Sequence, residues 1–275
     1  MELKVLFSED PAFVLSRAGV FLSSQPVLHN LVLSILHARV AHGDPGRYWM
    51  AIQHDDTVGV VLQSPLTFPA TLTPMESPVA TAMADAIAEA GVALLGINGE
   101  AATAARFAGQ WTERSKSAGV PFQGNRLYEF LEIGKVPRIE GQLRQAGPKD
   151  RSLMILWTRA FQNEIGESDN DTELRVDRAL AAGELWQWDR SGETVSMAVS
   201  REPVHGVVRL SGVYTPPEKR KHGYAAACVH ALSKQLRDAG YRCILYTDLG
   251  NPTSNSIYRR IGYRAVAEVL RYRFE

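Results

Sequence analysis

The first group of residues suited to chemistry lies at 215–225, where the sequence reads Thr-Pro-Pro-Glu-Lys-Arg-Lys-His-Gly-Tyr-Ala. Lys219, Arg220 and Lys221 supply three cations in this loop. Gly223 follows, and it lets the backbone approach a ligand closely because glycine carries no side chain. A helical pattern starts at Tyr224, so its first turn presents free N–H groups behind a basic loop. A helix start of this kind binds a phosphate or pyrophosphate group.

A second group of reactive residues lies in a helix predicted to start at Asn251. Asn251 is a good N-cap, and the proline after it suits the first helical position. Tyr258 follows two turns later. A tyrosine with an ordinary pKa of ~10 keeps its proton at neutral pH and can act as a general acid. Ser254 and Asn255 are expected on the exposed first turn. The helix is predicted to end at Gly262.

Elements in the order strand, loop, helix, strand, helix must position these residues. The apolar run 206–214 predicts a strand, and two prolines end it at about Thr215 because proline cannot donate to a sheet ladder. Apolar residues then recur at helical spacing until Gly240, which predicts a helix with a glycine C-cap. Residues 243–248 predict a short buried strand ahead of the Asn251 helix.

Two motifs in this order resemble sequence features of the GNAT superfamily of N-acetyltransferases. The first resembles the family's acyl-CoA pyrophosphate loop and reads Arg220-x-x-Gly223-x-Ala225. The second resembles the family's closing asparagine–tyrosine helix and reads Asn251 followed by Tyr258-x-x-Ile261-Gly262-Tyr263. The resemblance implies an α/β protein with the acyl-CoA N-acyltransferase (GNAT) fold, in which a mixed, mostly antiparallel sheet is flanked by helices.

The resemblance also implies transfer of an acetyl group from acetyl-CoA to a primary amine by direct attack on the thioester. Tyr258 is the implied general acid, and a backbone N–H near Val213 is expected to face the thioester oxygen. A longer acyl-CoA is an alternative donor, and the acceptor is a small molecule or a peptide. The residues expected to bind the cofactor are Val213, Tyr214, Thr215, Arg220, Lys221, His222, Gly223, Tyr224, Ala225, Asn251, Ser254 and Asn255.

The general base has no obvious candidate, because the strand predicted at 205–215 carries no carboxylate. Glu184, at the start of a predicted hairpin, and His205 are alternatives, although each fits a surface position better. An ordered water is a third alternative, and an amine that arrives neutral needs no base.

Residues 1–135 and 139–275 are predicted to be two related halves joined by a linker at 134–138. Both read as strand, two helices, hairpin, third strand or loop, helix, strand, helix and strand, which indicates a tandem duplication. Residues 72–78 take the place of the cofactor loop but contain no arginine or glycine, and Ala105 stands where the second half has its tyrosine. We therefore expect a degenerate GNAT-like domain without a CoA loop at 1–135 and a catalytic GNAT domain at 139–275.

Hydrophobic patterning predicts the other elements of both halves. In the first half, helices are expected at 12–22, 27–41, 79–90 and 101–118, and strands at 3–6, 48–53, 58–63, 70–72, 92–97 and 127–133. In the second half, strands are expected at 142–145, 185–189 and 194–200, and helices after residue 150 and at 172–182.

Composition narrows the class of protein. The 275 residues contain 30 basic and 30 acidic side chains, so no overall charge favours nucleic acid or an anionic membrane. No signal-peptide pattern, membrane-spanning run or metal-ligand spacing is present in the sequence. Cys228 and Cys243 fit small buried hydrophobic residues. These features predict a cytoplasmic protein that uses no metal.

Two other functions are compatible with the motifs. A non-catalytic acyl-CoA-binding or regulatory module would keep the loop, and the strand without a carboxylate favours it, whereas Tyr258 argues against it. A structural interaction protein would not bind CoA at all. If the duplication is real, the first half has the shape without the cofactor loop, and we expect it to support the site, shape the substrate cleft or mediate formation of a homodimer.

Overall fold

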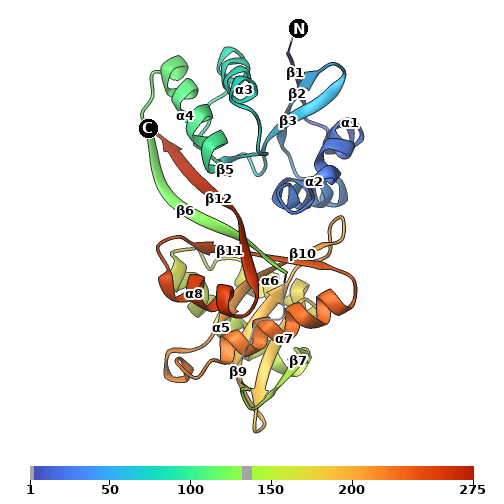
Figure 1. Ribbon diagram of the computed structural model, residues 1–275, viewed down its shortest axis with the longest axis vertical. Coiled ribbons are helices and arrows are strands. Elements are labelled where there is room, and N and C mark those ends of the chain that lie inside the picture. Colours follow the sequence, from blue (N-terminus) through green and yellow to red (C-terminus); the bar gives the residue numbers. More distant parts are fainter. Residues whose placement is uncertain (1–2, 132–137) are drawn as a thin grey trace. The chain divides into compact units, whose positions relative to one another are not determined.

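The computed structural model describes residues 3–131 and 138–275 (Figure 1). The chain forms two compact units. Unit 1 consists of the described residues up to Leu127 together with Thr247–Gly250 and Val266–Glu275, and unit 2 consists of Tyr128–Tyr246 and Asn251–Ala265. The predicted linker falls largely on residues 134–137, which lie outside the described residues. The division of the chain into halves at 135 and 139 stays a prediction.

Unit 1 contains four helices and a sheet. Its helices are α1 (Pro11–Ser24), α2 (Asn30–His42), α3 (Ser77–Glu89) and α4 (Ala101–Ser115). Its strands are β1 (Lys4–Ser8), β2 (Arg47–Gln53), β3 (Asp56–Gln63), β4 (Ala70–Leu72), β5 (Gly96–Glu100) and most of β6 (Gly119–Phe130) and β12 (Tyr263–Phe274).

Strands β1 to β5 and β12 form a mixed sheet in unit 1. Strands β1 to β4 pair in chain order, β5 runs parallel to β4, and β12 pairs antiparallel with β5. The core forms between this sheet and helices α3 and α4, and Met83, Phe107 and Trp111 fill it.

Unit 2 holds the predicted loop and both predicted motifs. Its strands are β7 (Gln142–Gln145), β8 (Leu185–Arg190), β9 (Glu193–Ser200), β10 (Val207–Tyr214) and most of β11 (Arg242–Asp248). Its helices are α5 (Arg151–Ile165), α6 (Thr172–Ala181), α7 (Tyr224–Asp238) and α8 (Pro252–Arg260). The strand order is β11-β10-β9-β8-β7, and only the β10–β11 pair is parallel.

Two cores lie on opposite faces of the unit 2 sheet. One core packs α7 against the sheet through residues such as Val208, Leu210 and Leu232. The other packs α5 and α6 through Met154, Trp157 and Val176. This arrangement, with helices on both faces of a mixed and mostly antiparallel sheet, confirms the predicted α/β class.

Two strand boundaries in unit 1 correct the predictions. The strand expected at 92–97 is instead Gly96–Glu100. The N–H of Val92 donates to the carbonyl of Ile87, and the N–H of Gly91 donates to that of Ala88. The residues from Gly91 therefore cap α3, and they are not free to start a strand.

The strand expected at 127–133 starts eight residues earlier, since β6 runs from Gly119 to Phe130. Residues 132–133 lie outside the described residues. The first part of β6 is partly exposed, and its sequence has no sustained alternation of apolar and polar residues that would predict a strand. Its pairing relies on distant segments: Ala118 and Glu275 exchange two backbone hydrogen bonds, and Arg271 donates to Gln123. Among the described residues, no helix is long and apolar enough to cross a membrane.

Candidate active site

The sheet of unit 2 opens between β10 and β11. The two parallel strands pair from Val207 to Leu210, opposite Arg242 to Leu245. Beyond this register β10 continues to Tyr214, and β11 continues within unit 2 to Tyr246. The register of β10 against β9 shifts between Ser211 and Tyr214. Such a bulge bends the strand, so the opening exposes backbone N–H and C=O groups that a ligand can bind.

Gly212 is the residue that allows this bend. Its φ is 55°, and a Cβ at this position would lie 2.9 Å from a methyl group of Val199. Both the backbone conformation and the limited space therefore favour glycine. The sequence pattern predicted the strand but did not reveal the bulge.

The predicted pantetheine-contact residues Val213, Tyr214 and Thr215 lie at this opening. Tyr214 is 5% exposed and points into the core beside α5, with its ring 6.1 Å from that of Trp157. Ser196 donates to the Tyr214 carbonyl at 3.0 Å and lies 2.9 Å from the Thr215 hydroxyl. The end of β10 is thus anchored to β9, and Tyr214 can offer a ligand only its backbone.

The loop after β10 turns through a short 3-10 helix, Pro217–Lys219, before α7 begins. Lys221 has φ 67° and Gly223 has φ 81°, so the chain enters α7 through left-handed residues. Gly223 is the N-cap and has no side chain to bond the first N–H groups of α7. The first turn, with Tyr224 and Ala225, therefore presents its N–H groups to a ligand, as the sequence predicts.

Two of the three loop cations already have partners. Arg220 Nε donates to the Thr215 carbonyl at 2.9 Å, and its Nη2 lies 2.5 Å from Glu164 on α5. Lys219 Nζ lies 2.5 Å from Glu193. Lys221 and His222 are exposed. Within the described residues, Lys221 is the predicted phosphate-binding cation that has no ion pair to break.

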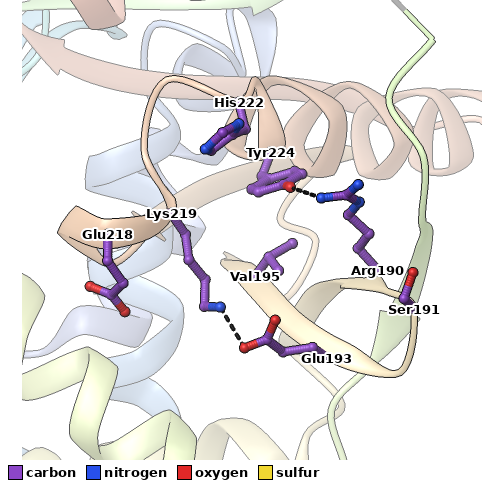
Figure 2. A pocket seen from close by; sticks show the side chains of 8 residues that line it. All are labelled: Arg190, Ser191, Glu193, Val195, Glu218, Lys219, His222 and Tyr224. Atoms are coloured by element: carbon purple, nitrogen blue, oxygen red, sulfur yellow. Dashed lines mark hydrogen bonds and ion pairs between the residues drawn. The ribbon is translucent and has the colours of Figure 1, made fainter.

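A pocket of about 400 Å³ lies on the β9 side of the loop (Figure 2). Arg190 donates to the Tyr224 hydroxyl at 2.8 Å, and the rings of His222 and Tyr224 stack at 5.5 Å. The pocket is lined by Arg190, Ser191, Glu193, Val195, Glu218, Lys219, His222 and Tyr224. Because β9 and β11 flank β10 on opposite sides, this pocket is separate from the strand opening.

Helix α8 is capped as predicted, but Asn255 is buried and not exposed. The side-chain oxygen of Asn251 accepts from the Ser254 N–H at 2.9 Å. Asn255 was expected on an exposed turn, yet it is only 4% exposed. Its amide accepts from the Tyr128 hydroxyl at 3.0 Å and donates to the Asn251 carbonyl at 2.8 Å. The side chain is buried because it satisfies the hydroxyl of a buried tyrosine.

Tyr258 lies on α8 with its ring centroid 5.8 Å from that of Tyr263 and 6.4 Å from that of Tyr128. Burial raises the pKa of Tyr258 to about 12. The phenol is therefore protonated throughout the neutral range, which is the state that a general acid requires.

The two alternative bases lie at the other end of the strands. The Glu184 carboxylate accepts from Arg201 at 3.1 Å and from the N–H of Glu202 at 2.9 Å. His205 lies in the turn before β10. The strand opening is at Tyr214, which pairs with Met197. The structure therefore does not bring Glu184 or His205 to the predicted thioester position.

The described part of the chain gives little evidence for catalysis by a metal ion or by a cysteine thiolate. It contains no cluster of three or more His, Cys, Asp or Glu side chains placed to hold a metal ion. Cys228 and Cys243 are buried, and burial raises the pKa of both thiols to about 12. Neither thiol forms the thiolate that nucleophilic catalysis needs.

The second pair of parallel strands is β4 and β5 in unit 1, and the loop and helix start beside it differ from those beside β10 and β11. The Thr103 hydroxyl accepts from the N–H of Met75 at 3.1 Å, which ties the loop after β4 to α4. The Glu100 carboxylate accepts from the N–H groups of Ala102 and Thr103. The first turn of α4 is thus occupied by a carboxylate of the chain itself.

A family model described as FR47-like protein matches residues 190–272, which include the loop, α7, β11 and α8. No curated protein matches the chain. Solved structures resemble it over nearly its whole length at low identity. An acetyltransferase of the GNAT family from Colwellia psychrerythraea has a TM-score of 0.62 and 12% identity, with 100% of both chains covered.

Two further structures agree with this match. A GCN5-related N-acetyltransferase from Sphaerobacter thermophilus has a TM-score of 0.64 and 12% identity, covering 98% of this chain and 95% of its own. A Drosophila protein has a TM-score of 0.66 and 13% identity, with 98% of each chain covered. These matches confirm the resemblance drawn from the motifs, and the chain has the fold of the GNAT acetyltransferases.

Proposed function

We propose that the protein is an acetyl-CoA-dependent N-acetyltransferase that acetylates a primary amine, with its active site in unit 2. The observation that carries the proposal is the opening between β10 and β11 beside the unblocked N-terminus of α7. An opened parallel pair offers backbone groups to an extended amide-containing arm, and the helix start offers N–H groups to a pyrophosphate. The fold of named acetyltransferases supports the same activity.

Specific residues of unit 2 fit the donor. The N–H groups of the first turn of α7 would hold the pyrophosphate, with Lys221 adding charge. Val213 and Thr215 would align the pantetheine arm with their backbone groups, and the N–H of Val213 would stabilise negative charge on the thioester oxygen. When bound, acetyl-CoA supplies an acyl group activated as a thioester.

Tyr258 would hold the proton that the thiolate takes up. Its raised pKa keeps it protonated at neutral pH. No carboxylate lies on β10, so we propose that the amine loses its proton to water or binds in its neutral form. We also propose that the site operates in a reducing, cytoplasmic setting, which fits two buried free cysteines.

A second candidate function is an acyl-CoA-binding module without catalysis. The absence of a carboxylate on β10 favours it. The two functions differ in what happens after acetyl-CoA binds, because only the enzyme releases thiol faster when an amine is present.

The test measures thiol release from acetyl-CoA across a panel of amines, for the native chain and Tyr258→Phe. General acid catalysis contributes about 10²–10⁴ in rate, so Tyr258→Phe should lower kcat by that factor while acetyl-CoA still binds. Binding of acetyl-CoA without amine-dependent release would support the module. Equal rates for both proteins would remove Tyr258 from the chemistry.

A further inference from the structure

Arg209 and Ser211 lie two residues apart on β10 and therefore on the same face of the strand. Ser211 pairs with Val199, which belongs to the core on the α5 side of the sheet. Neither side chain has a hydrogen-bond or ion-pair partner within residues 3–131 and 138–275. The Ser211 hydroxyl is buried in this unpaired state. A guanidinium and a hydroxyl that both lack partners are a pair of donors without an acceptor.

Charges near Arg209 do not neutralise it. Glu184 is the carboxylate that acts on it, but that group already accepts from Arg201 and from the N–H of Glu202. Arg201 is a second cation close to the first, and Tyr246 on β11 contributes only a phenol. Burial, the largest effect, lowers the pKa of Arg209. Arg209 is partly buried, and a cation partly withdrawn from water without a counter-ion is unfavourable unless something else supplies the negative charge.

The pair lies on the strand that leads to the predicted thioester position. At ~3.3 Å per residue, Ser211 is about 7 Å and Arg209 about 13 Å along the strand from Val213. The Arg209 side chain is long enough to shorten the second separation. A small molecule could therefore contact these two donors while its amine lies near Val213.

This inference rests on the proposed function. We propose that Arg209 and Ser211 bind an acidic group of the acceptor, so that the substrate is an amine that also carries a carboxylate or a phosphate. Arginine presents two parallel N–H groups that match the oxygens of either anion, and the serine hydroxyl adds a third donor. The aliphatic residues beside them, such as Val199, suit the short hydrocarbon segment that joins the amine to the acidic group.

The test compares matched amines with acetyl-CoA as donor. β-Alanine is compared with propylamine for the carboxylate, and phosphoethanolamine with ethanolamine for the phosphate. We expect kcat/KM of the native protein to favour the acidic member of at least one pair by roughly ten- to a hundredfold, as for hydrogen bonds to charged groups. A preference in the first pair identifies the acidic group of the substrate as a carboxylate, and a preference in the second identifies it as a phosphate.

Three variants separate recognition from folding. Arg209→Gln should abolish the preference, Arg209→Lys should keep part of it, and Ser211→Ala should reduce it. Arg273→Gln, which removes an exposed cation in unit 1, should change nothing. Melting temperatures establish that each variant is folded. An equal rate for acidic and neutral amines, or a preference that survives in folded Arg209→Gln, would overturn the inference.

Calorimetry with acetyl-CoA distinguishes failure of the acidic-group inference from failure of the proposed function. If acetyl-CoA does not bind the native protein, the proposed function fails, and the inference with it. If acetyl-CoA binds but none of the four amines is acetylated, the melting temperature of the CoA-bound protein is measured with and without β-alanine or phosphoethanolamine. This measurement shows whether the acidic amines bind. A stabilisation that Arg209→Gln removes supports the acidic-group site. No stabilisation, or equal stabilisation of both proteins, contradicts it.

Discussion

At the scale of the residue, the proposed acid and the buried thiols share one electrostatic environment. Burial raises the pKa of Tyr258, Cys228 and Cys243 to about 12 and also raises that of Tyr263. Groups buried in apolar surroundings resist ionisation because the charged form loses its hydration. Their neutral state is therefore part of the stability of the core around α7 and α8.

This predicts a loss of stability in alkali. A folded-state pKa above the unfolded value gives stability that is complete below the unfolded value and lost as pH rises through the folded value. For Tyr258 that window runs from ~10, the ordinary tyrosine value, to about 12. Urea unfolding at increasing pH should show falling stability in this window, and Tyr258→Phe should lessen the fall. An unchanged slope in that variant would contradict the assignment.

The residue types did predict part of the site. Asn251 caps α8 as its position indicated, and Gly223 directly precedes the first turn of α7, as expected. The left-handed conformation of Gly223 was not predicted. Arg220 was less predictable, because its partner Glu164 is far away in the sequence. Arg209 and Ser211 could have been noticed as polar residues in the apolar run Val-Val-Arg-Leu-Ser-Gly-Val-Tyr. Their lack of partners, however, depends on which groups the fold brings near.

At the scale of the element, α8 depends on its cap to hold Tyr258 in place. Asn251→Ala should destabilise the protein by about 1 kcal/mol, since an N-cap hydrogen bond is lost. It should lower the acetylation rate more than acetyl-CoA affinity, because α8 carries the proposed acid. Chemical unfolding and thiol release measure the two effects.

Asn251→Ser is the matched control for this prediction, because serine is a comparable N-cap. It should restore most of the stability and rate. Equal losses in both variants would show that Asn251 acts through its side-chain amide and not as a cap.

Element boundaries show where sequence patterns stop being informative. Strand β10 and helix α7 follow from local apolar spacing, and both were predicted closely. Strand β6 was predicted too short, because its first part pairs with segments more than a hundred residues away and has no apolar alternation of its own. The opening between β10 and β11 likewise depends on a register shift that no local pattern encodes.

At the scale of the whole molecule, the two parallel strand pairs predict a binding stoichiometry. The pair in unit 2 is open beside an unblocked helix start, whereas in unit 1 the loop between β4 and α3 contains no arginine or glycine, has Glu76 at the N-cap of α3 and is tied to α4 by the Met75–Thr103 hydrogen bond. We expect one acetyl-CoA per chain in a calorimetric titration. Two equivalents would show that unit 1 also binds the cofactor.

The measurement that tests the account most directly is the melting temperature with and without acetyl-CoA. A ligand at about 100 times its dissociation constant stabilises the folded state by ~2.7 kcal/mol. The native protein should show this stabilisation. Gly223→Glu should lose it, because a carboxylate at the N-terminus of α7 repels the pyrophosphate and strains a residue with φ 81°.

Gly240→Glu provides the matched control, because Gly240 also has positive φ and lies past the other end of α7 with open space around it. It should melt lower than the native protein yet still respond to acetyl-CoA. A native shift that Gly223→Glu abolishes and Gly240→Glu retains would place the cofactor on the loop. No shift in the native protein, or an equal shift in Gly223→Glu, would contradict the proposed site.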